Sequence, residues 1–274
     1  MCVFCKLYGE GQRWYLNPEN YGRHMYRKRE PGAGFSEYGR AYRGQRASAP
    51  SPIECRNDEP EKFPDVVRQW WQNLEKQRPS QVVTLADTLK ILDLSHPVAA
   101  LWCECRRAYR GWIEDNPKLY SCLGTGVGMF KYERWPERYK GGVDFMTPEE
   151  AKDWTRKWVK RGMVVTLMTY GAPYIGGICL CDYPSCGLIK RRLDLGIDLL
   201  KGHEVARVDL GGCTGCGDCI QRCQFGALKM DVIRKKAFID MTRCFGCGLC
   251  ADVCRSEAIN LQDRSTFPGL KEAW

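Results

Sequence analysis

The same spacing of four cysteines occurs twice in the last third of the chain, and no other feature constrains the fold as strongly. The stretches CTGCGDCIQRC (residues 213–223) and CFGCGLCADVC (residues 244–254) both follow C-x2-C-x2-C-x3-C. Three thiolates at this spacing line a tight loop around one face of an iron–sulfur cubane, whereas the fourth lies on the next helical turn and points away. We therefore expect each stretch to give three ligands to one [4Fe–4S] cluster and its fourth cysteine to the other.

This crossed scheme assigns four cysteines to each cluster. Cluster I is assigned Cys213, Cys216, Cys219 and Cys254, and cluster II is assigned Cys244, Cys247, Cys250 and Cys223. Gly217 and Gly248 fall inside the loops, where the backbone must bend around an inorganic core. The alternating segments EVARVD and KKAFID precede the loops and predict strands. The 31-residue offset is an internal repeat, so we predict two half-modules related by a pseudo-twofold axis.

On these residues, positions 203–262 resemble the bacterial two-cluster [4Fe–4S] ferredoxins. The resemblance implies a ferredoxin-type fold, two [4Fe–4S] clusters and transfer of single electrons. The family usually has proline after the fourth cysteine, where this chain has Gln224 and Arg255. We expect this departure to affect the reduction potentials more than cluster binding. Zinc ligation, or eight cysteines buried as plain core residues, is the alternative.

Six further cysteines in the middle of the chain follow a looser pattern. A predicted helix, a predicted strand, a C-x-C pair and a later cysteine occur in this order twice, so residues 80–200 are interpreted as an α/β domain with two related halves. The cysteines concerned are Cys103, Cys105, Cys122, Cys179, Cys181 and Cys186. Thiols at strand ends are hard to explain by packing, so we predict a third [4Fe–4S] cluster here. A zinc site and free thiols remain alternatives.

Residues 84–262 as a whole are also similar to a broad group of anaerobe proteins in which C-x-C-R…C-L and I-C-x-C segments precede a ferredoxin module. The residues that carry this second resemblance are Cys103, Cys105, Arg106, Cys122, Leu123, Ile178, Cys179 and Cys181. It implies a multi-cluster iron–sulfur protein and does not imply what the middle domain does.

Residues 1–60 are rich in Gly, Arg, Tyr and Pro and show little apolar periodicity. We expect an extended, basic arm that docks on a partner subunit, because Tyr and Arg are favoured at interfaces. Binding of nucleic acid is the alternative. Cys2 and Cys5 form one more C-x2-C pair, and with two cysteines left over from the middle domain they would suffice for a fourth cluster. His24, His96 and His203 are expected to be solvated or to cap helices.

The composition excludes several classes of protein. The chain has 17 cysteines in 274 residues without a secretory signal pattern, so metal ligands are expected rather than a disulfide scaffold, and the compartment is expected to be the cytoplasm. No run of 18 apolar residues predicts a membrane span. The formal charge of +9 is weak evidence for nucleic acid, because bound anionic clusters would reduce it.

The sequence therefore predicts an α+β fold with three parts: an arm (1–60), an α/β cysteine-containing domain (61–202) and a two-cluster ferredoxin domain with a tail (203–274). The predicted function is an electron-transfer subunit of an anaerobic oxidoreductase complex, whose partners are catalytic or electron-donating subunits. No catalytic residue is assigned. One alternative is an oxidoreductase with a catalytic cluster or cofactor in the middle domain. A second is an iron–sulfur regulator that binds nucleic acid.

Overall fold

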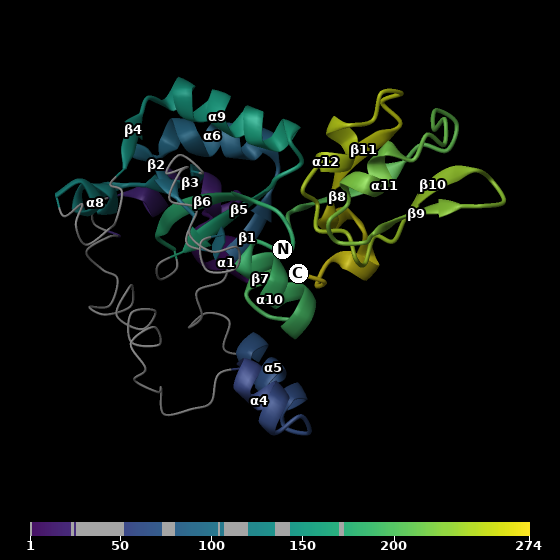
Figure 1. The fold of residues 1–274 in the computed structure, drawn as a ribbon, viewed down its shortest axis with the longest axis horizontal. Coiled ribbons are helices and arrows are strands. Elements are labelled where there is room, and N and C mark those ends of the chain that lie inside the picture. Colours follow the sequence, from purple (N-terminus) through teal and green to yellow (C-terminus); the bar gives the residue numbers. More distant parts are fainter. Residues whose placement is uncertain are drawn as a thin grey trace.

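The structure is a computed structural model that describes residues 2–22, 25, 52–72, 80–103, 105–106, 120–134, 143–169 and 173–274. Helices and strands are mixed, and the strands form one seven-stranded sheet and two two-stranded sheets (Figure 1). The large sheet lies in the middle region, and both small sheets lie in the C-terminal region, to the right in Figure 1.

The seven-stranded sheet has the order β4-β2-β3-β6-β5-β1-β7. Its strands are β1 (Ser80–Val83), β2 (Val98–Trp102), β3 (Tyr120–Thr125), β4 (Asp144–Met146), β5 (Val164–Thr169), β6 (Ile175–Cys181) and β7 (Leu199–Leu200). All neighbours are antiparallel except β1 and β7, which are parallel. A mainly antiparallel sheet differs from the α/β domain expected from the sequence, because the consecutive strands β2 and β3, and likewise β5 and β6, lie side by side and antiparallel.

Two related halves build this sheet, as the sequence analysis expected. Each half has the order strand, helix, strand, strand: β1, α6 (Leu85–Leu94), β2 and β3, then β4, α9 (Pro148–Lys160), β5 and β6. The first strand of each half pairs with the other half, because β4 joins β2 and β1 joins β5. The two C-x-C pairs do not hold equivalent positions, however. Cys103 follows the second strand of its half, whereas Cys179 and Cys181 lie on the third strand of theirs.

Local sequence signals explain the two helices that pack side by side over the sheet (Figure 1). The Thr84 side chain accepts a hydrogen bond from the backbone N–H of Asp87 at the start of α6. Thr147 and Glu150 form a complete capping box at the start of α9. The remaining helices around the sheet are α4 (Pro52–Asp58), α5 (Phe63–Gln72), η4 (Val127–Met129), α8 (Phe130–Arg134) and α10 (Gly187–Leu195).

The C-terminal region is the ferredoxin-like part of the molecule, and it repeats one plan twice. Its elements are β8 (Glu204–Val208), α11 (Asp218–Arg222), β9 (Leu228–Asp231), β10 (Lys236–Ile239), α12 (Leu249–Asp252), β11 (Ile259–Asp263), η5 (Arg264–Thr266) and η6 (Pro268–Leu270). β8 pairs with β11, and β9 pairs with β10, both antiparallel. Gly217 and Gly248 precede α11 and α12 with φ of 86° and 84°, which is the left-handed conformation that favours glycine.

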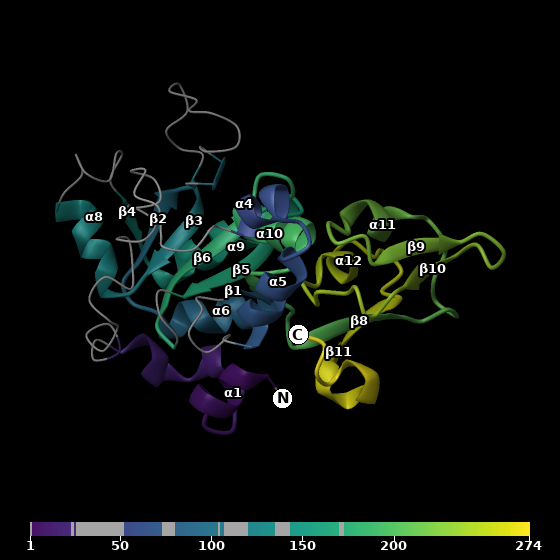
Figure 2. The same ribbon diagram turned by 90° about the horizontal axis from the view of Figure 1, so that it is seen from below.

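Residues 2–22 differ from the extended arm that the sequence predicted. They form α1 (Val3–Tyr8), η1 (Trp14–Leu16) and η2 (Pro18–Tyr21), and they lie close to the end of the chain (Figure 2). Phe4, Trp14 and Tyr15 are 1% exposed and belong to the main core. The Trp14 Nε1–H donates to Gln81 Oε1 on β1 at 2.6 Å. Burial of these aromatic side chains folds the segment onto the core, although its composition is rich in Gly and Arg.

Residues 26–51 of the arm predicted to dock on a partner (1–60) lie outside the described residues, so that role stays a prediction. Within the described part of the chain, no helix has both the length and the apolar character needed to cross a membrane.

Candidate metal centres

Four cysteines of the C-terminal region surround one cavity, of about 360 Å³ including space open to solvent. They are Cys223, Cys244, Cys247 and Cys250, and the aromatic rings of Phe225 and Phe245 complete the wall. These two rings stack with their centroids 4.1 Å apart. The cavity brings together the four cysteines that the sequence assigned to cluster II.

A second cavity of about 320 Å³ is lined by Cys213, Cys216, Cys219 and Cys254. These are the cysteines that the sequence assigned to cluster I, three from one repeat and one from the other. Each set has two buried cysteines, and the sets differ at one of the others, because Cys216 is exposed whereas Cys223 and Cys247 are half-buried. Ligation of clusters by either set stays a prediction.

The backbone around the cavities fits anionic sulfur. The N–H groups of Ala206 and Gly246 donate to Cys244 Sγ at 3.5 and 3.4 Å, and the N–H of Ala227 donates to Cys223 Sγ at 3.3 Å. Such hydrogen bonds favour thiolates and tune the potentials of iron–sulfur clusters. In the absence of a cluster, desolvation raises the pKa of the Cys247 thiol to about 12. A cation bound to the sulfur would remove that penalty.

A buried arginine stands beside the second repeat. Arg264 is fully buried and donates to the carbonyl oxygens of Gly202, Glu204 and Cys244 at 2.7–3.1 Å. Its Nη1 has no hydrogen-bond partner within the described residues. Burial lowers the pKa of this guanidinium, and the negative charges of Cys244 and Asp263 oppose the effect. An anionic cluster in the adjacent cavity would compensate the buried cation.

The six middle cysteines form one connected group of thiols. Cys122 on β3 and Cys179 on β6 are paired in the sheet register, with their Sγ atoms 3.8 Å apart. Hydrogen bonds from Cys105, Cys122 and Cys181 hold the pKa of Cys103 well below its usual range. Hydrogen bonds with Cys103 and then Cys186 raise the pKa of Cys181. The structure therefore brings together all six cysteines that the sequence singled out, five of them buried.

Arg106 supplies positive charge beside this middle group. Its Nη2 donates to Asp182 Oδ1 at 3.0 Å, and its guanidinium lies 5.3 Å from the ring centroid of Trp158. Burial alone would lower its pKa, but the negative charges of Cys181 and Asp182 raise it above the ordinary value. Its buried Nε has no hydrogen-bond partner within the described ranges. A buried donor of this kind suits the sulfur of an anionic cluster, so the residues present fit the predicted group.

Gln224, one of the two departures from the ferredoxin pattern, connects the two regions. Its Nε2 donates to the carbonyl of Gly162 at 2.6 Å, and its Oε1 accepts from the N–H of Tyr183 at 2.8 Å. Tyr183 lies between Cys181 and Cys186, and Gln224 follows Cys223. The loop that carries two middle cysteines therefore touches the residue next to a cluster II cysteine. The sequence marked Gln224 as unusual but carried no signal of this contact.

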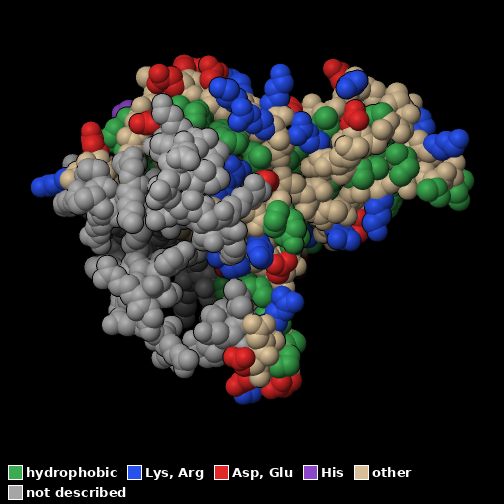
Figure 3. All heavy atoms as spheres, in the orientation of Figure 1, with side chains coloured by type: hydrophobic (Ala, Val, Ile, Leu, Met, Phe, Trp, Pro, Cys, Tyr) green, Lys and Arg blue, Asp and Glu red, His purple; other side chains and the backbone are tan. Residues whose placement is uncertain are grey.

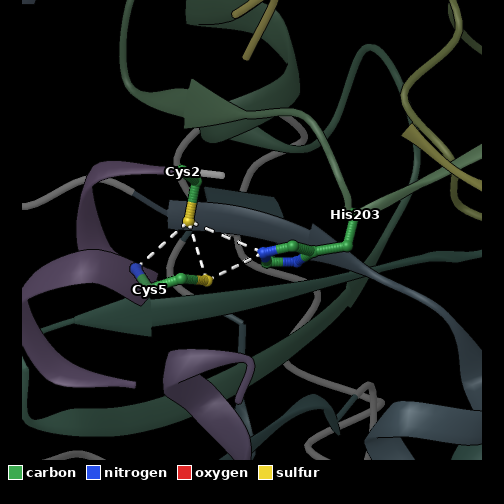
Figure 4. A group of neighbouring side chains, drawn as sticks. All are labelled: Cys2, Cys5 and His203. Atoms are coloured by element: carbon green, nitrogen blue, oxygen red, sulfur yellow. Dashed lines mark hydrogen bonds between the residues drawn. The ribbon is translucent and has the colours of Figure 1, made fainter. Parts of the chain in front are cut away.

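Cys2 and Cys5 lie against His203, which the sequence expected to be solvated or to cap a helix. That expectation is wrong, because His203 is 7% exposed and its Nε2 lies 3.5 Å from Cys2 Sγ and 3.0 Å from Cys5 Sγ (Figure 4). The residues are 201 and 198 positions apart, so no local pattern signals the group. Cys55 is buried, and its thiol contacts the carbonyl of Glu59. His24 lies outside the described residues.

Comparison with known proteins supports the assignment of the C-terminal region. The family model described as "4Fe-4S dicluster domain" matches residues 212–259, which include all eight cysteines of the two repeats. No curated protein sequence matches the chain. Residues 212–259 are thus similar to a 4Fe-4S dicluster domain, which supports two [4Fe–4S] clusters and iron–sulfur electron transfer as the chemistry of this region.

Proposed function

We propose that the chain is an iron–sulfur electron-transfer subunit that relays single electrons between a middle site, cluster II and cluster I, in that order or its reverse. The contact of Gln224 with Tyr183 carries the proposal, because it joins the middle cysteine loop directly to the residue that follows Cys223 of the cluster II set. Cys216 of the cluster I set is exposed, which supports placing cluster I at one end of this order.

The proposed ligands are the crossed sets given above and four of the six middle cysteines. Bound cubanes would supply one-electron redox chemistry at potentials set by hydrogen bonds and solvent exposure. The chain's own residues would tune these potentials. Backbone N–H groups donate to the sulfurs of Cys223 and Cys244. The side chains of Arg264 and Arg106 hold positive charge near the cysteines. The stacked rings of Phe225 and Phe245 exclude water from the side that faces the middle domain.

Iron content tests the middle site most directly. Anaerobically prepared protein should contain about twelve irons per chain if three cubanes are present. Cys181→Ala should remove about four of them and leave the signals of the two C-terminal clusters. Cys55→Ala is the matched control, because Cys55 is also buried but lies outside the three groups. A wild-type content of about eight irons, unchanged in Cys181→Ala, would refute the third cluster.

The proposed partners are catalytic or electron-donating subunits of a cytoplasmic, anaerobic oxidoreductase complex. The hairpin of β9 and β10 exposes Val232, Ile233 and Phe238 by 80%, 90% and 58%, at the right-hand end of the molecule in Figure 3. This hairpin adjoins the cluster I loop, since the Lys236 ammonium donates to the carbonyl of Cys213. An apolar tip beside the more exposed site suits a docking surface for a redox partner.

Co-purification of the native complex tests this partner surface. Val232→Ser combined with Ile233→Ser should release the redox subunits without changing the iron content. Phe130→Ser provides the control, because Phe130 is 52% exposed on α8 of the other region. Retention of the subunits by the double variant would exclude the hairpin as the docking element.

The surplus of two middle cysteines over the four needed by a cubane favours a second candidate, an oxidoreductase with a catalytic cluster in the middle domain. Such an enzyme would turn over a substrate as a lone chain, whereas an electron-transfer subunit would require its partner. Turnover by the isolated chain would therefore decide for this second candidate.

A further inference from the structure

The N-terminal segment brings two thiols to a histidine at the junction of the two regions. Cys2, Cys5 and His203 are 2%, 4% and 7% exposed, and their three ligand atoms lie within 4.8 Å of one another. The two Sγ atoms are 3.0 Å apart, and both face Nε2 of the imidazole (Figure 4). Three soft or borderline ligands that converge in a buried place are the donor set of a transition-metal ion.

A hydrogen-bond chain assigns the tautomer of the imidazole. The Tyr15 hydroxyl donates to Asp87 Oδ2 at 2.9 Å, and that carboxylate also receives the Arg13 guanidinium at 2.5 Å. The single proton of Tyr15 is therefore used, so its oxygen accepts the Nδ1–H of His203 across 3.0 Å. The Nε2 lone pair is left facing the two thiols. Metal-bound histidines are commonly oriented in this way, through a hydrogen bond on the ring nitrogen away from the metal.

The separations suit one ion rather than a cubane. With Zn–S bonds of about 2.3 Å and Zn–N bonds of about 2.0–2.1 Å, tetrahedral ligand atoms stand about 3.5–3.8 Å apart. The two S···N distances of 3.0 and 3.5 Å are near this range, and the S···S distance of 3.0 Å needs a small outward rotation of one thiol. In a cubane each thiolate binds a different iron, so the sulfurs would be much farther apart.

We propose that Cys2, Cys5 and His203 bind one Zn²⁺ ion, separate from the iron–sulfur clusters. Binding converts the two thiols to thiolates and releases their two protons to solvent. The described residues supply no fourth ligand within this group, so a water molecule completes the tetrahedron. This site replaces the fourth cubane that the sequence allowed for Cys2 and Cys5.

The position of the ion gives it a structural role. His203 lies between β7 and β8, where the chain passes from the large sheet to the ferredoxin-like region. Arg13 makes a parallel connection, because it pairs with Asp87 of α6 and with Glu204 of β8 at 2.5 Å each. The ion would therefore fasten the N-terminal segment to the junction and hold the two regions in one arrangement.

The alternative for the same residues is a redox-active dithiol, since a C-x2-C pair beside histidine also forms disulfides. A zinc site and a disulfide require different states of the same residues. Zinc needs both thiolates free and the imidazole unprotonated at Nε2, whereas a disulfide uses both sulfurs and needs no histidine ligand.

Metal analysis of the full-length, cluster-loaded protein tests the proposal. We expect about one zinc per chain besides iron. Cys5→Ser and His203→Asn should each lose that zinc and keep the iron content, whereas Cys55→Ser and His96→Asn should keep both metals. Tyr15→Phe should bind zinc about 10–100-fold more weakly, because it removes the hydrogen bond that orients the ligand.

A second measurement covers the case in which these variants fold poorly. Zinc-edge X-ray absorption of the wild type should show two sulfur neighbours and two nitrogen or oxygen neighbours around the zinc. His203→Cys should still bind zinc, with three sulfur neighbours. Absence of zinc from the anaerobic protein and failure to take up added Zn²⁺ would overturn the proposal. Loss of iron instead of zinc in Cys5→Ser, or a native mass two hydrogens lower that indicates a Cys2–Cys5 disulfide, would also overturn it.

Discussion

At the scale of single residues, two glycines let the cysteine loops lie directly against neighbouring backbone. Gly215 has φ of 75°, and a Cβ there would stand 2.2 Å from the carbonyl oxygen of Lys235. Gly246 has φ of 70°, and a Cβ there would stand 2.0 Å from the carbonyl oxygen of Glu204. The contacts are with backbone, which cannot move aside as a flexible side chain would. The loops therefore tolerate no side chain at these positions.

We expect Gly246→Ala to destroy the cluster II site while the cluster I site survives. The added methyl group pushes the loop away from β8, and Cys244 Sγ then loses the hydrogen bond from the N–H of Ala206 on that strand. Iron content should fall by about four per chain, with one of the two C-terminal signals lost from the electron paramagnetic resonance spectrum. Gly269→Ala is the control, because a Cβ there meets nothing within 4 Å.

Crossed ligation predicts which cysteine variants resemble one another. Cys254→Ala should give the same spectrum as Cys216→Ala, and Cys223→Ala the same as Cys247→Ala, because the members of each pair line one cavity. Electron paramagnetic resonance of the reduced proteins is the measurement. If Cys254→Ala instead resembled Cys247→Ala, each repeat would bind its own cluster and the crossed scheme would be wrong.

The sequence predicted most of the candidate metal-binding cysteines, but it did not predict which residues from distant parts of the chain contact one another. The spacing of eight cysteines predicted which four meet in each cavity, because it is set by one loop and one helical turn. The burial of His203 against Cys2 and Cys5 was missed, since these cysteines lie about 200 residues away. Gln224 stood out only as a departure from the ferredoxin pattern, and its two contacts depend on how separate regions pack.

At the scale of secondary-structure elements, α11 and the turn after it join the ferredoxin-like region to the large sheet. Arg222 donates to the carbonyl of Lys160 at 2.8 Å, and Gln224 bonds to Gly162 and Tyr183. The groups that these two side chains contact in the middle region all belong to the backbone: two carbonyls and one N–H. The joint therefore depends on the geometry of the turn after α9 and of the loop after β6, and little on their side chains.

We expect Gln224→Ala to loosen this joint by about 1–2 kcal/mol, since two hydrogen bonds are lost. Hydrogen exchange should quicken at residue 183, whose N–H loses its acceptor, while the iron content stays unchanged. Electron transfer between the middle site and the C-terminal clusters should slow. Gln221→Ala, at an exposed position of α11, is the matched control. Equal exchange rates in the two variants would show that Gln224 does not hold the joint.

Helices with clear capping signals were predictable, and so was the strand that follows each of them in the two halves of the sheet. Thr84 and Thr147 cap α6 and α9. The pairing of β1 with β5 and of β4 with β2 was not predictable, because exchange of strands between halves leaves each local pattern unchanged. Nor did local composition reveal that Phe4, Trp14 and Tyr15 are buried, since their partners come from distant elements.

At the scale of the whole molecule, the two regions depend to different degrees on metal. Cysteines belong to both cores, but the large sheet also has an extensive set of apolar side chains, whereas the core of the C-terminal region is small. Phe225, Phe245 and Leu249, which lie at the cluster II end, belong to the larger core. The cluster I loop (residues 213–219) and the β9–β10 hairpin contribute no residue to that core.

Removal of iron with a chelator under oxidising conditions should therefore unfold the cluster I end first. We expect residues 209–219 and the β9–β10 hairpin to lose protection from hydrogen exchange, while β3, β5 and β6 remain protected. Mass spectrometry of peptides from the apoprotein and the loaded protein is the measurement. Uniform loss of protection across both regions would mean that the large sheet also needs its metal to fold.

The exchange of first strands between the two halves of the sheet has a consequence for biosynthesis. Cys122 and Cys179 meet where β3 pairs with β6, so the thiol group straddles the boundary between an early and a late part of the chain. A nascent chain that has exposed only the first half lacks β4 beside β2 and lacks half of the thiols. A complete middle group of thiols therefore exists only after Cys186 has left the ribosome, so the cluster proposed for this group would be inserted after translation of the domain.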